Sequence, residues 1–411
     1  MAGDLDCSDG AQFAWQEQSS HLLLNPRLPK SELEFLHELH AGMPIFSAHV
    51  WLATSGTTAR GVRARKLVGL SKGALLCSAQ AVNQILQSHR KDVWISVLPI
   101  FHVGGLGIWA RAFLAENRVV SGLLREKWDA AYFVSAAAEA GATLSALVPT
   151  QVFDLVSAGL RCPDSLRAII VGGGALAPHL YQSARRLGWP LLPSYGMTEC
   201  ASQVATVPLT TLAPKGRDGL DPNEGTMDLS GLGLAVLPHL EVRQGADEFL
   251  QIRGASLLTG YALEKDGEKI FLDPKDHQGW FTTEDRGEMR GEYLHVRGRD
   301  QDFVKILGEI VNLIHLESIA LNLADRLGIK VDLAIGVRVD PRRGARLCLC
   351  LGEGASLGNG DLVLREFNQV VAPFERLSEF HILPLELRNA LGKVNRHALS
   401  EWLNQIPDAP V

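Results

Sequence analysis

A regular alternation of short apolar runs and helix-like stretches between residues 51 and 194 constrains the fold of this chain most strongly. The apolar runs are rich in β-branched residues and lie at Asp92–Leu98, Thr143–Val148, Leu166–Val171 and Leu191–Ser194. Because Ala- and Leu-rich amphipathic stretches separate them, the pattern predicts a parallel sheet covered by helices. Open α/β sheets bind ligands beyond the carboxyl ends of their strands. Gly-rich turns follow several of these runs, so we expect the functional site there.

The pattern changes after residue 234, where alternating strands such as Glu248–Arg253 and Tyr293–Val296 are separated by Gly and Asp turns. A second βα pattern, with a helix expected at Leu316–Leu327, follows the charged segment Arg297–Asp302. We therefore predict an α/β protein of two domains. Residues 1–298 would form a large N-terminal domain of parallel sheet, flanking helices and a β-rich subdomain, and residues 299–411 a small mobile α+β domain.

Composition excludes several classes of function. A net charge of -6 leaves no basic surplus to neutralise a nucleic-acid backbone. The six cysteines are scattered without paired metal-ligand spacing, which favours reduced thiols over a disulfide framework. The N-terminal residues MAGDLDCSDG are unlike a secretory signal, and no apolar run is long enough to span a membrane. We expect a cytoplasmic protein that does not bind nucleic acid and does not span a membrane.

A loop rich in Ser, Thr and Gly follows the short apolar run that begins at Trp51. Its backbone N–H groups and hydroxyls suit phosphate oxygens, and Lys66 could add positive charge. The candidate phosphate-binding residues are Thr54, Ser55, Gly56, Thr57 and Thr58. A flexible, solvated turn explains these residues equally well. The loop by itself therefore leaves phosphate binding open.

The segment SYGMTE, which starts at Ser194, contains side chains with separable chemistry. Tyr195 offers a ring face for a purine, Thr198 a hydroxyl for a phosphate, and Glu199 a carboxylate. Mg²⁺ takes one or two protein carboxylates together with phosphate oxygens, so one Glu is sufficient. The alternative is a turn at a strand end with an incidental Glu. The Gly-rich turn GGGA after the predicted strand ending at Val171 favours the ligand site.

Together, the loop at Thr54 and SYGMTE resemble the signatures of the acyl-adenylate-forming superfamily of AMP-binding acyl- and aryl-CoA ligases. The resemblance implies that ATP or AMP is bound by Thr54, Ser55, Gly56, Thr57, Thr58, Lys66, Gly173, Gly174, Ala175, Tyr195, Gly196, Asp285 and Arg299. The chain departs from the superfamily pattern at several positions, among them Gln301, Asn389 and Leu391 in the C-terminal part. Ala59 replaces a Gly, Lys66 stands four residues later than the superfamily lysine, and Glu284 occupies a position where Gly is usual.

The same resemblance implies roles for residues that would otherwise attract no attention. The implied catalytic residues are Lys393, which would bridge the acid and the α-phosphate, Glu199, the magnesium ligand, and Thr198. The implied substrate residues are His102, Gly196 and Ser202, whereas Gln301 matches the hinge between the domains and Gly308 the turn that enters the site for coenzyme A. Taken alone, a histidine after a strand is usually structural, and a lysine near a terminus is usually a surface charge.

Within the superfamily, stretches such as YGMTECASQVAT and LQIRGASLLTGY are similar to the o-succinylbenzoate-CoA ligases of menaquinone biosynthesis. This similarity implies an acid-thiol ligase that uses ATP, Mg²⁺ and coenzyme A and acts on a small aromatic carboxylic acid. Two alternatives stay open: another acyl- or aryl-CoA ligase, fatty-acyl or benzoate-like, and a degenerate nucleotide-binding protein without turnover.

Only 53 residues precede Thr54, whereas members of the superfamily have a further sheet layer there. We therefore expect an N-terminal subdomain that is truncated relative to the superfamily. Residues Asp4–Phe46, or a second subunit in a homodimer, would have to replace the missing wall.

Overall fold

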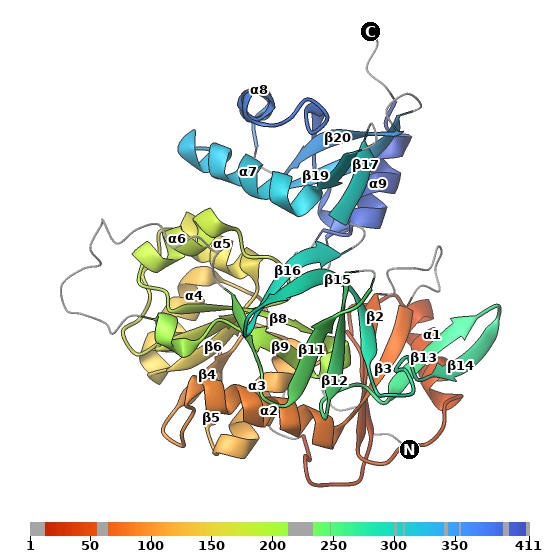
Figure 1. Cartoon of the computed structure of the whole chain (residues 1–411). Helices are drawn as coiled ribbons and strands as arrows, with labels where there is room; N and C mark the ends of the chain where they lie inside the picture. The colour runs from red at the N-terminus through yellow and green to blue at the C-terminus, as the bar shows by residue number, and fades with distance from the viewer. Residues whose placement is uncertain are drawn as a thin grey trace.

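The computed structural model describes residues 13–55, 65–212, 233–246, 248–299, 302–306, 309–340, 344–352, 355–388 and 394–407. They form the mixed α/β architecture that the alternating pattern predicted (Figure 1). Within the described part of the chain, no helix has the length and apolar character needed to cross a membrane.

The largest sheet has eleven strands and joins a parallel half to an antiparallel half. The parallel half runs in the order β5 (Arg118–Ser121), β4 (Val93–Ser96), β6 (Leu144–Leu147), β7 (Ala168–Val171) and β8 (Leu191–Met197). The four predicted apolar runs are thus confirmed as neighbouring parallel strands. All side chains of β6 and β7 are buried, as expected for strands covered on both faces.

Helices cover both faces of this parallel half (Figure 1). On one face lie α2 (Lys72–Leu86) and α3 (Val103–Ala115), whose residues Val82 and Ile108 pack against Trp94. On the other lie α4 (Ala130–Ala140), α5 (Pro149–Ser157) and α6 (Pro178–Arg186), which share a second buried cluster. The crossover helices therefore leave the carboxyl ends of the strands open to ligands.

The antiparallel half continues from β8 through β9 (Ser202–Thr206), β10 (Leu234–Val236), β16 (Tyr293–Arg299), β15 (Phe281–Arg290), β12 (Phe249–Gly254) and β11 (Leu240–Gln244). Five of these strands, β10, β11, β12, β15 and β16, lie in the β-rich region that the sequence predicted after residue 234, whereas β9 precedes it. Because β8 belongs to both halves, its carboxyl end lies where the two kinds of sheet meet.

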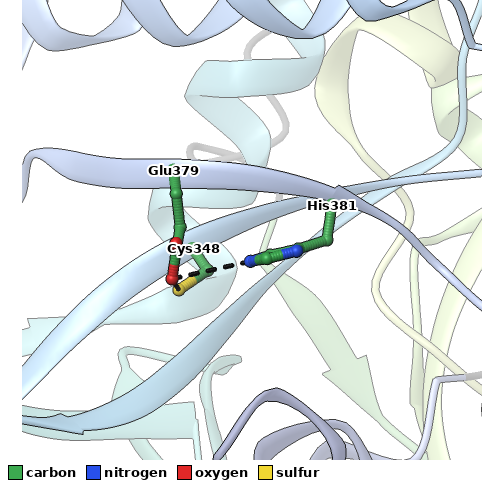
Figure 2. Close-up of side chains that lie close together, drawn as sticks. All are labelled: Cys348, Glu379 and His381. Carbon is green, nitrogen blue, oxygen red and sulfur yellow. Dashed lines mark hydrogen bonds and ion pairs between the residues drawn. The ribbon is translucent and has the colours of Figure 1, made fainter. Parts of the chain in front are cut away.

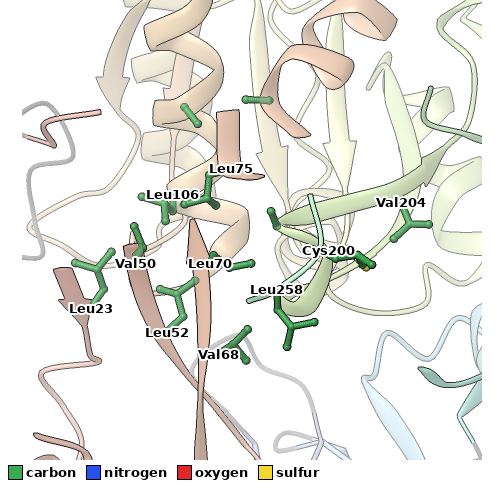
Figure 3. Packing of buried hydrophobic residues seen from close by; sticks show 14 of the residues in the cluster. Leu23, Val50, Leu52, Val68, Leu70, Leu75, Leu106, Cys200, Val204 and Leu258 are labelled. Atoms are coloured by element: carbon green, nitrogen blue, oxygen red, sulfur yellow. The ribbon is translucent and has the colours of Figure 1, made fainter. Parts of the chain in front are cut away.

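A five-stranded sheet contains the N-terminal residues. Its order is β1 (His21–Leu23), β2 (His49–Ser55), β3 (Arg65–Ser71), β13 (Gly260–Lys265) and β14 (Glu268–Leu272). One face packs on α1 (Lys30–Ala41) through Leu36 and Leu39. The other face packs on α2 and α3, where Leu75 and Leu106 meet the strands (Figure 3). Residues 21–46 thus add the strand β1 and the helix α1 to this sheet.

The C-terminal elements have a core of their own. A sheet of β19 (Leu333–Asp340), β20 (Gly344–Leu351) and β21 (Leu377–Ile382) packs on α7 (Leu313–Arg326) and α8 (Leu357–Val370) on one face and on α9 (Arg396–Gln405) on the other. The hairpin of β17 (Phe303–Ile306) and β18 (Glu309–Asn312) precedes them. In Figure 1 these elements lie above α5 and α6. The domain boundary at residue 298 stays a prediction.

Candidate active site

The SYGMTE motif lies at the carboxyl end of β8. Residues 194–197 leave the parallel half and pair with β9, and a 3-10 turn at Thr198–Cys200 connects the two strands. A side chain at Gly196 would collide with the Ser202 carbonyl oxygen, so only glycine allows this close hairpin. The tight connection holds Tyr195, Gly196 and Glu199 on one edge of the sheet.

Glu199 contacts two residues from the neighbouring five-stranded sheet. The Lys66 Nζ lies 3.2 Å from Glu199 Oε1, and the Tyr261 hydroxyl donates a hydrogen bond to the same oxygen at 3.0 Å. The Lys66 ammonium also lies 3.8 Å from the centre of the Tyr261 ring. The backbone is anchored as well, because the Leu258 N–H donates to the Glu199 carbonyl at 2.8 Å. The expected magnesium ligand is therefore held in a network.

The strands β2 and β3 place the two ends of the expected phosphate loop side by side. Thr54 and Lys66 are opposite each other in the antiparallel register. The Thr54 hydroxyl is buried and has no hydrogen-bond partner among the described residues. Of the other predicted phosphate-binding residues, Ser55 is described only in its backbone, and Gly56, Thr57 and Thr58 lie outside the described residues.

Tyr195 and Asp285 meet across the sheet. The Tyr195 hydroxyl donates to Asp285 Oδ2 at 2.7 Å, and the Asp285 side chain is buried on β15. Burial, together with the Asp285 charge, raises the pKa of Tyr195 well above its ordinary value, so this hydroxyl remains a donor. The residues expected at the purine and the ribose are thus in contact.

Asp285 also lies opposite Arg299 in the register of β15 and β16, although the Arg299 side chain is outside the described part. Cys200, which follows Glu199 in the chain, is fully buried. Burial, Glu199 and Asp285 raise the pKa of this thiol well above its ordinary value. One edge of the sheet therefore gathers Glu199, Asp285 and a neutral thiol.

The GGGA turn directly follows β7 and lies beside β8. Gly173 has φ +80, a backbone conformation that favours glycine. A side chain at Gly172 would lie 3.1 Å from the Ser194 hydroxyl, and one at Gly174 would contact Pro149 at the start of α5. The turn, with Gly173, Gly174 and Ala175, therefore borders the same edge as SYGMTE.

A buried arginine that the sequence did not single out lies next to Ser202. The Arg111 guanidinium on α3 donates to Ser202 Oγ at 3.2 Å, and the residue is 1% exposed. No carboxylate among the described residues forms an ion pair with it, and its Nε has no hydrogen-bond partner there. Burial lowers the pKa of Arg111 to about 10, which leaves it charged at neutral pH. His102 occupies the N-cap position of this same helix, without a capping hydrogen bond from its side chain.

Three predicted residues lie outside the described residues: the hinge Gln301, the Gly308 turn and the catalytic candidate Lys393. Their roles stay predictions. The strands β17 and β18, which flank residues 307–308 in the sequence, pair as an antiparallel hairpin.

A second cluster of polar side chains lies in the C-terminal sheet (Figure 2). Cys348 on β20 and Glu379 and His381 on β21 bring their potential ligand atoms within 4.8 Å of one another. However, Arg338 donates to Glu379 Oε1 at 2.9 Å, and burial with the Glu379 charge raises the pKa of Cys348 to about 12. The thiol is therefore protonated, and the carboxylate is already paired with a guanidinium. These side chains are better suited to hydrogen bonds between the strands than to binding a cation.

The fold and the clustered residues define the class of protein. The sequence of residues 44–261 matches the AMP-binding enzyme family, and the chain belongs to it. Among curated proteins, it is 31% identical over 342 residues to a 2-succinylbenzoate–CoA ligase of Salmonella typhimurium, covering 82% of this chain and 67% of that one. A ligase of the same name from Bacillus licheniformis is 26% identical, with 90% and 72% covered.

Solved structures agree on the fold. The o-succinylbenzoate CoA synthetase of Bacillus subtilis, in complex with the acyl-adenylate intermediate, superposes with a TM-score of 0.72. It is 22% identical, and the match covers 92% of this chain and 82% of that one.

Proposed function

We propose that this chain is an ATP-dependent acid-CoA ligase that converts o-succinylbenzoate to o-succinylbenzoyl-CoA through an acyl adenylate. The observation that carries the activity is the gathering of Glu199, Asp285 and Tyr195 at one edge of the sheet in a member of the AMP-binding family. Relatives that bear the name of this ligase support the choice of reaction.

The reaction consists of two displacements. The carboxylate of the acid attacks the α-phosphorus of ATP, the bond to the bridging oxygen breaks, and pyrophosphate leaves. The thiol of coenzyme A then loses its proton and attacks the acyl carbonyl, and AMP leaves. We assign Tyr195 to the purine, Asp285 and Arg299 to the ribose, and the loop at Thr54 to the phosphates. Lys393 would stabilise charge shared by the acid and the α-phosphate.

Glu199 fits the metal that such chemistry uses, because its carboxylate lies where the phosphate loop and the nucleotide residues meet. Bound there, Mg²⁺ would neutralise charge on the phosphate oxygens. Thr198, which precedes Glu199 in the 3-10 turn, would donate a hydrogen bond from its hydroxyl to a phosphate. These assignments rest on the family resemblance and on the network around Glu199.

The Arg111 guanidinium supports a dicarboxylic acid as the substrate. A buried charge without a counter-ion is costly, and a carboxylate delivered by a ligand would remove that cost. o-Succinylbenzoate retains a second carboxylate when the first is activated, whereas benzoate and fatty acids do not. Arg111 and Ser202 would bind this second carboxylate, with His102 and Gly196 lining the acyl pocket.

We also propose that the enzyme works in a reducing compartment such as the cytoplasm, since the five described cysteines are free. We further propose that two copies of the chain form a homodimer, in which the second subunit contributes to the acyl or coenzyme A channel.

Pyrophosphate release tests the function directly. Purified protein would receive ATP and Mg²⁺ with o-succinylbenzoate, benzoate or octanoate, each with and without coenzyme A. We expect release with o-succinylbenzoate, thioester only when coenzyme A is present, and loss of release in Lys393→Ala. Release with another acid alone would retain the mechanism and refute the substrate, and silence with all three would refute both.

A further inference from the structure

The pair formed by Lys66 and Glu199 is more than a surface contact. The two side chains come from different sheets and are only 25% and 14% exposed, respectively. Exposed ion pairs contribute little to stability, but a largely buried carboxylate that loses its partner is strongly destabilised. Glu199 therefore needs a positive charge beside it whether or not a metal is bound.

Tyr261 contacts both members of the pair. It lies on β13, directly across from Val68 of β3, so its ring is beside the strand that carries Lys66. Its hydroxyl donates to Glu199 Oε1, and its ring face contacts the Lys66 ammonium. Burial, together with Glu199, raises the pKa of Tyr261 far above its ordinary value, so the hydroxyl keeps the proton that it donates.

Both contacts are made to the same carboxylate oxygen. Lys66 and Tyr261 approach Oε1, and no hydrogen bond to Oε2 is formed within the described part of the chain. A divalent cation bound to Glu199 would lie about 2 Å from a carboxylate oxygen. It would then be within a few ångströms of the Lys66 ammonium, and two positive centres at that separation repel each other in a partly buried site.

We propose that Lys66 is the resident counter-ion of Glu199 in the nucleotide-free chain, that Tyr261 holds this pair together, and that a divalent cation reaches Glu199 as Lys66 leaves it for the triphosphate. The exchange keeps Glu199 neutralised throughout and gives Lys66 a new anion, because Lys66 is next to the end of the phosphate loop. The inference rests on the proposed function only in assuming that this site takes a metal–nucleotide complex.

The first test measures binding of Mn²⁺ alone to the nucleotide-free protein, using the electron paramagnetic resonance signal of the free ion. In Lys66→Met, Glu199 loses its counter-ion, and we expect Mn²⁺ to bind roughly tenfold more tightly than in the unmodified chain. Lys66→Arg retains the charge and should leave the affinity low. An affinity in Lys66→Met equal to that of the unmodified chain would overturn the proposal.

A matched control is available on the surface of the same sheet. Lys269 forms an ion pair with Glu38 at the same nitrogen-to-oxygen distance of 3.2 Å, but both groups are more exposed. Lys269→Met should leave Mn²⁺ affinity unchanged. A gain there equal to the gain in Lys66→Met would attribute the effect to net charge and would also overturn the proposal.

Tyr261→Phe tests the second half of the inference, because it removes the hydroxyl and keeps the ring beside Lys66. We expect an Mn²⁺ affinity between those of the unmodified chain and Lys66→Met. The double variant should bind no more tightly than Lys66→Met, since both changes act on one pair. Independent, additive gains would refute the role of Tyr261 in holding the pair.

These measurements use no acid, so they separate the two proposals. Tighter Mn²⁺ binding in Lys66→Met together with no pyrophosphate release from any acid would refute the proposed function and support the counter-ion. Adenylation of o-succinylbenzoate by the unmodified chain, together with an unchanged Mn²⁺ affinity in Lys66→Met, would support the proposed function and refute the role of Lys66 as counter-ion.

Discussion

At the scale of single residues, the hydrogen bond from Tyr195 to Asp285 joins the two residues assigned to the nucleoside. Tyr195→Phe keeps the ring and removes the donor to a buried carboxylate. Hydrogen bonds to charged groups contribute about 1.5–3 kcal/mol, so we expect the free energy of unfolding to fall by about that amount. Urea denaturation measures it.

Tyr181 provides the matched control for this substitution. It is also buried, but its hydroxyl has no hydrogen-bond partner among the described residues. Tyr181→Phe should therefore leave the free energy of unfolding unchanged or raise it slightly. An equal loss in the free energy of unfolding for the two variants would mean that the hydrogen bond to Asp285 does not stabilise the fold.

Arg111 predicts a change in substrate preference. In Arg111→Met the guanidinium is replaced by an uncharged chain of similar length, and kcat/KM for o-succinylbenzoate should fall by about 10- to 100-fold. Activity with benzoate, which has no second carboxylate, should change little. Because an unpaired buried charge is removed, stability should not fall. An equal loss of kcat/KM for both acids would contradict the assigned contact.

The sequence predicted these site residues unequally. SYGMTE and GGGA could be found because each is a continuous segment after a predicted strand. Arg111 was missed because an arginine in a predicted helix is normally assigned to the solvated face, and Tyr261 because it ends the apolar run LLTGY. The pairing of Lys66 with Glu199 depends on how two sheets meet, which no local pattern contains.

At the scale of elements, Asp92 ties the starts of several strands of the parallel half. It precedes β4 and accepts hydrogen bonds from Arg167 before β7, from Thr143 before β6, and from the His89 N–H. Burial alone would raise the pKa of Asp92, but Arg167 and the other donors lower it from 3.8 to about 2. The ionised form of Asp92 is therefore more stable in the folded chain than in the unfolded chain.

The sign of this shift sets its pH dependence. A folded pKa below the unfolded value stabilises the protein fully above pH 3.8, and the contribution is lost as the pH falls towards about 2. We expect Asp92→Asn to lower the free energy of unfolding by about 2 kcal/mol at pH 7. The difference from the unmodified chain should shrink between pH 4 and pH 2 in urea titrations, and a constant difference would exclude ionisation as the cause.

Element types were predicted better than their ends or partners. The strand expected at Leu166–Val171 is β7, but the helix expected from Leu316 begins at Leu313, because the Asn312 side chain caps it by accepting from the His315 N–H. The five-stranded sheet was not predicted. Its strands β3 and β13 are nearly two hundred residues apart in the chain, and only tertiary packing brings them together.

At the scale of the whole molecule, the C-terminal elements contact the large sheet region through α6 and α7. Nearby, the Lys330 Nζ donates to the Ser157 carbonyl at 3.2 Å. The proposed reaction requires both Lys393 and the Gly308 turn to reach one site. One small domain cannot present both at the same time, so we expect it to rotate about residues 299–301 between adenylation and thioester formation.

A crosslink across this contact tests the rotation. Ser157→Cys with Lys330→Cys, joined by a short bis-maleimide, would lock the domains in the described arrangement. We expect one half-reaction to continue and the other to stop, measured as pyrophosphate release without coenzyme A and as thioester formation from preformed adenylate. The single-cysteine variants, treated with the same reagent, carry the same native thiols and should retain both steps. If the locked protein performs both half-reactions, or neither while the controls perform both, one rotating domain does not serve the two steps.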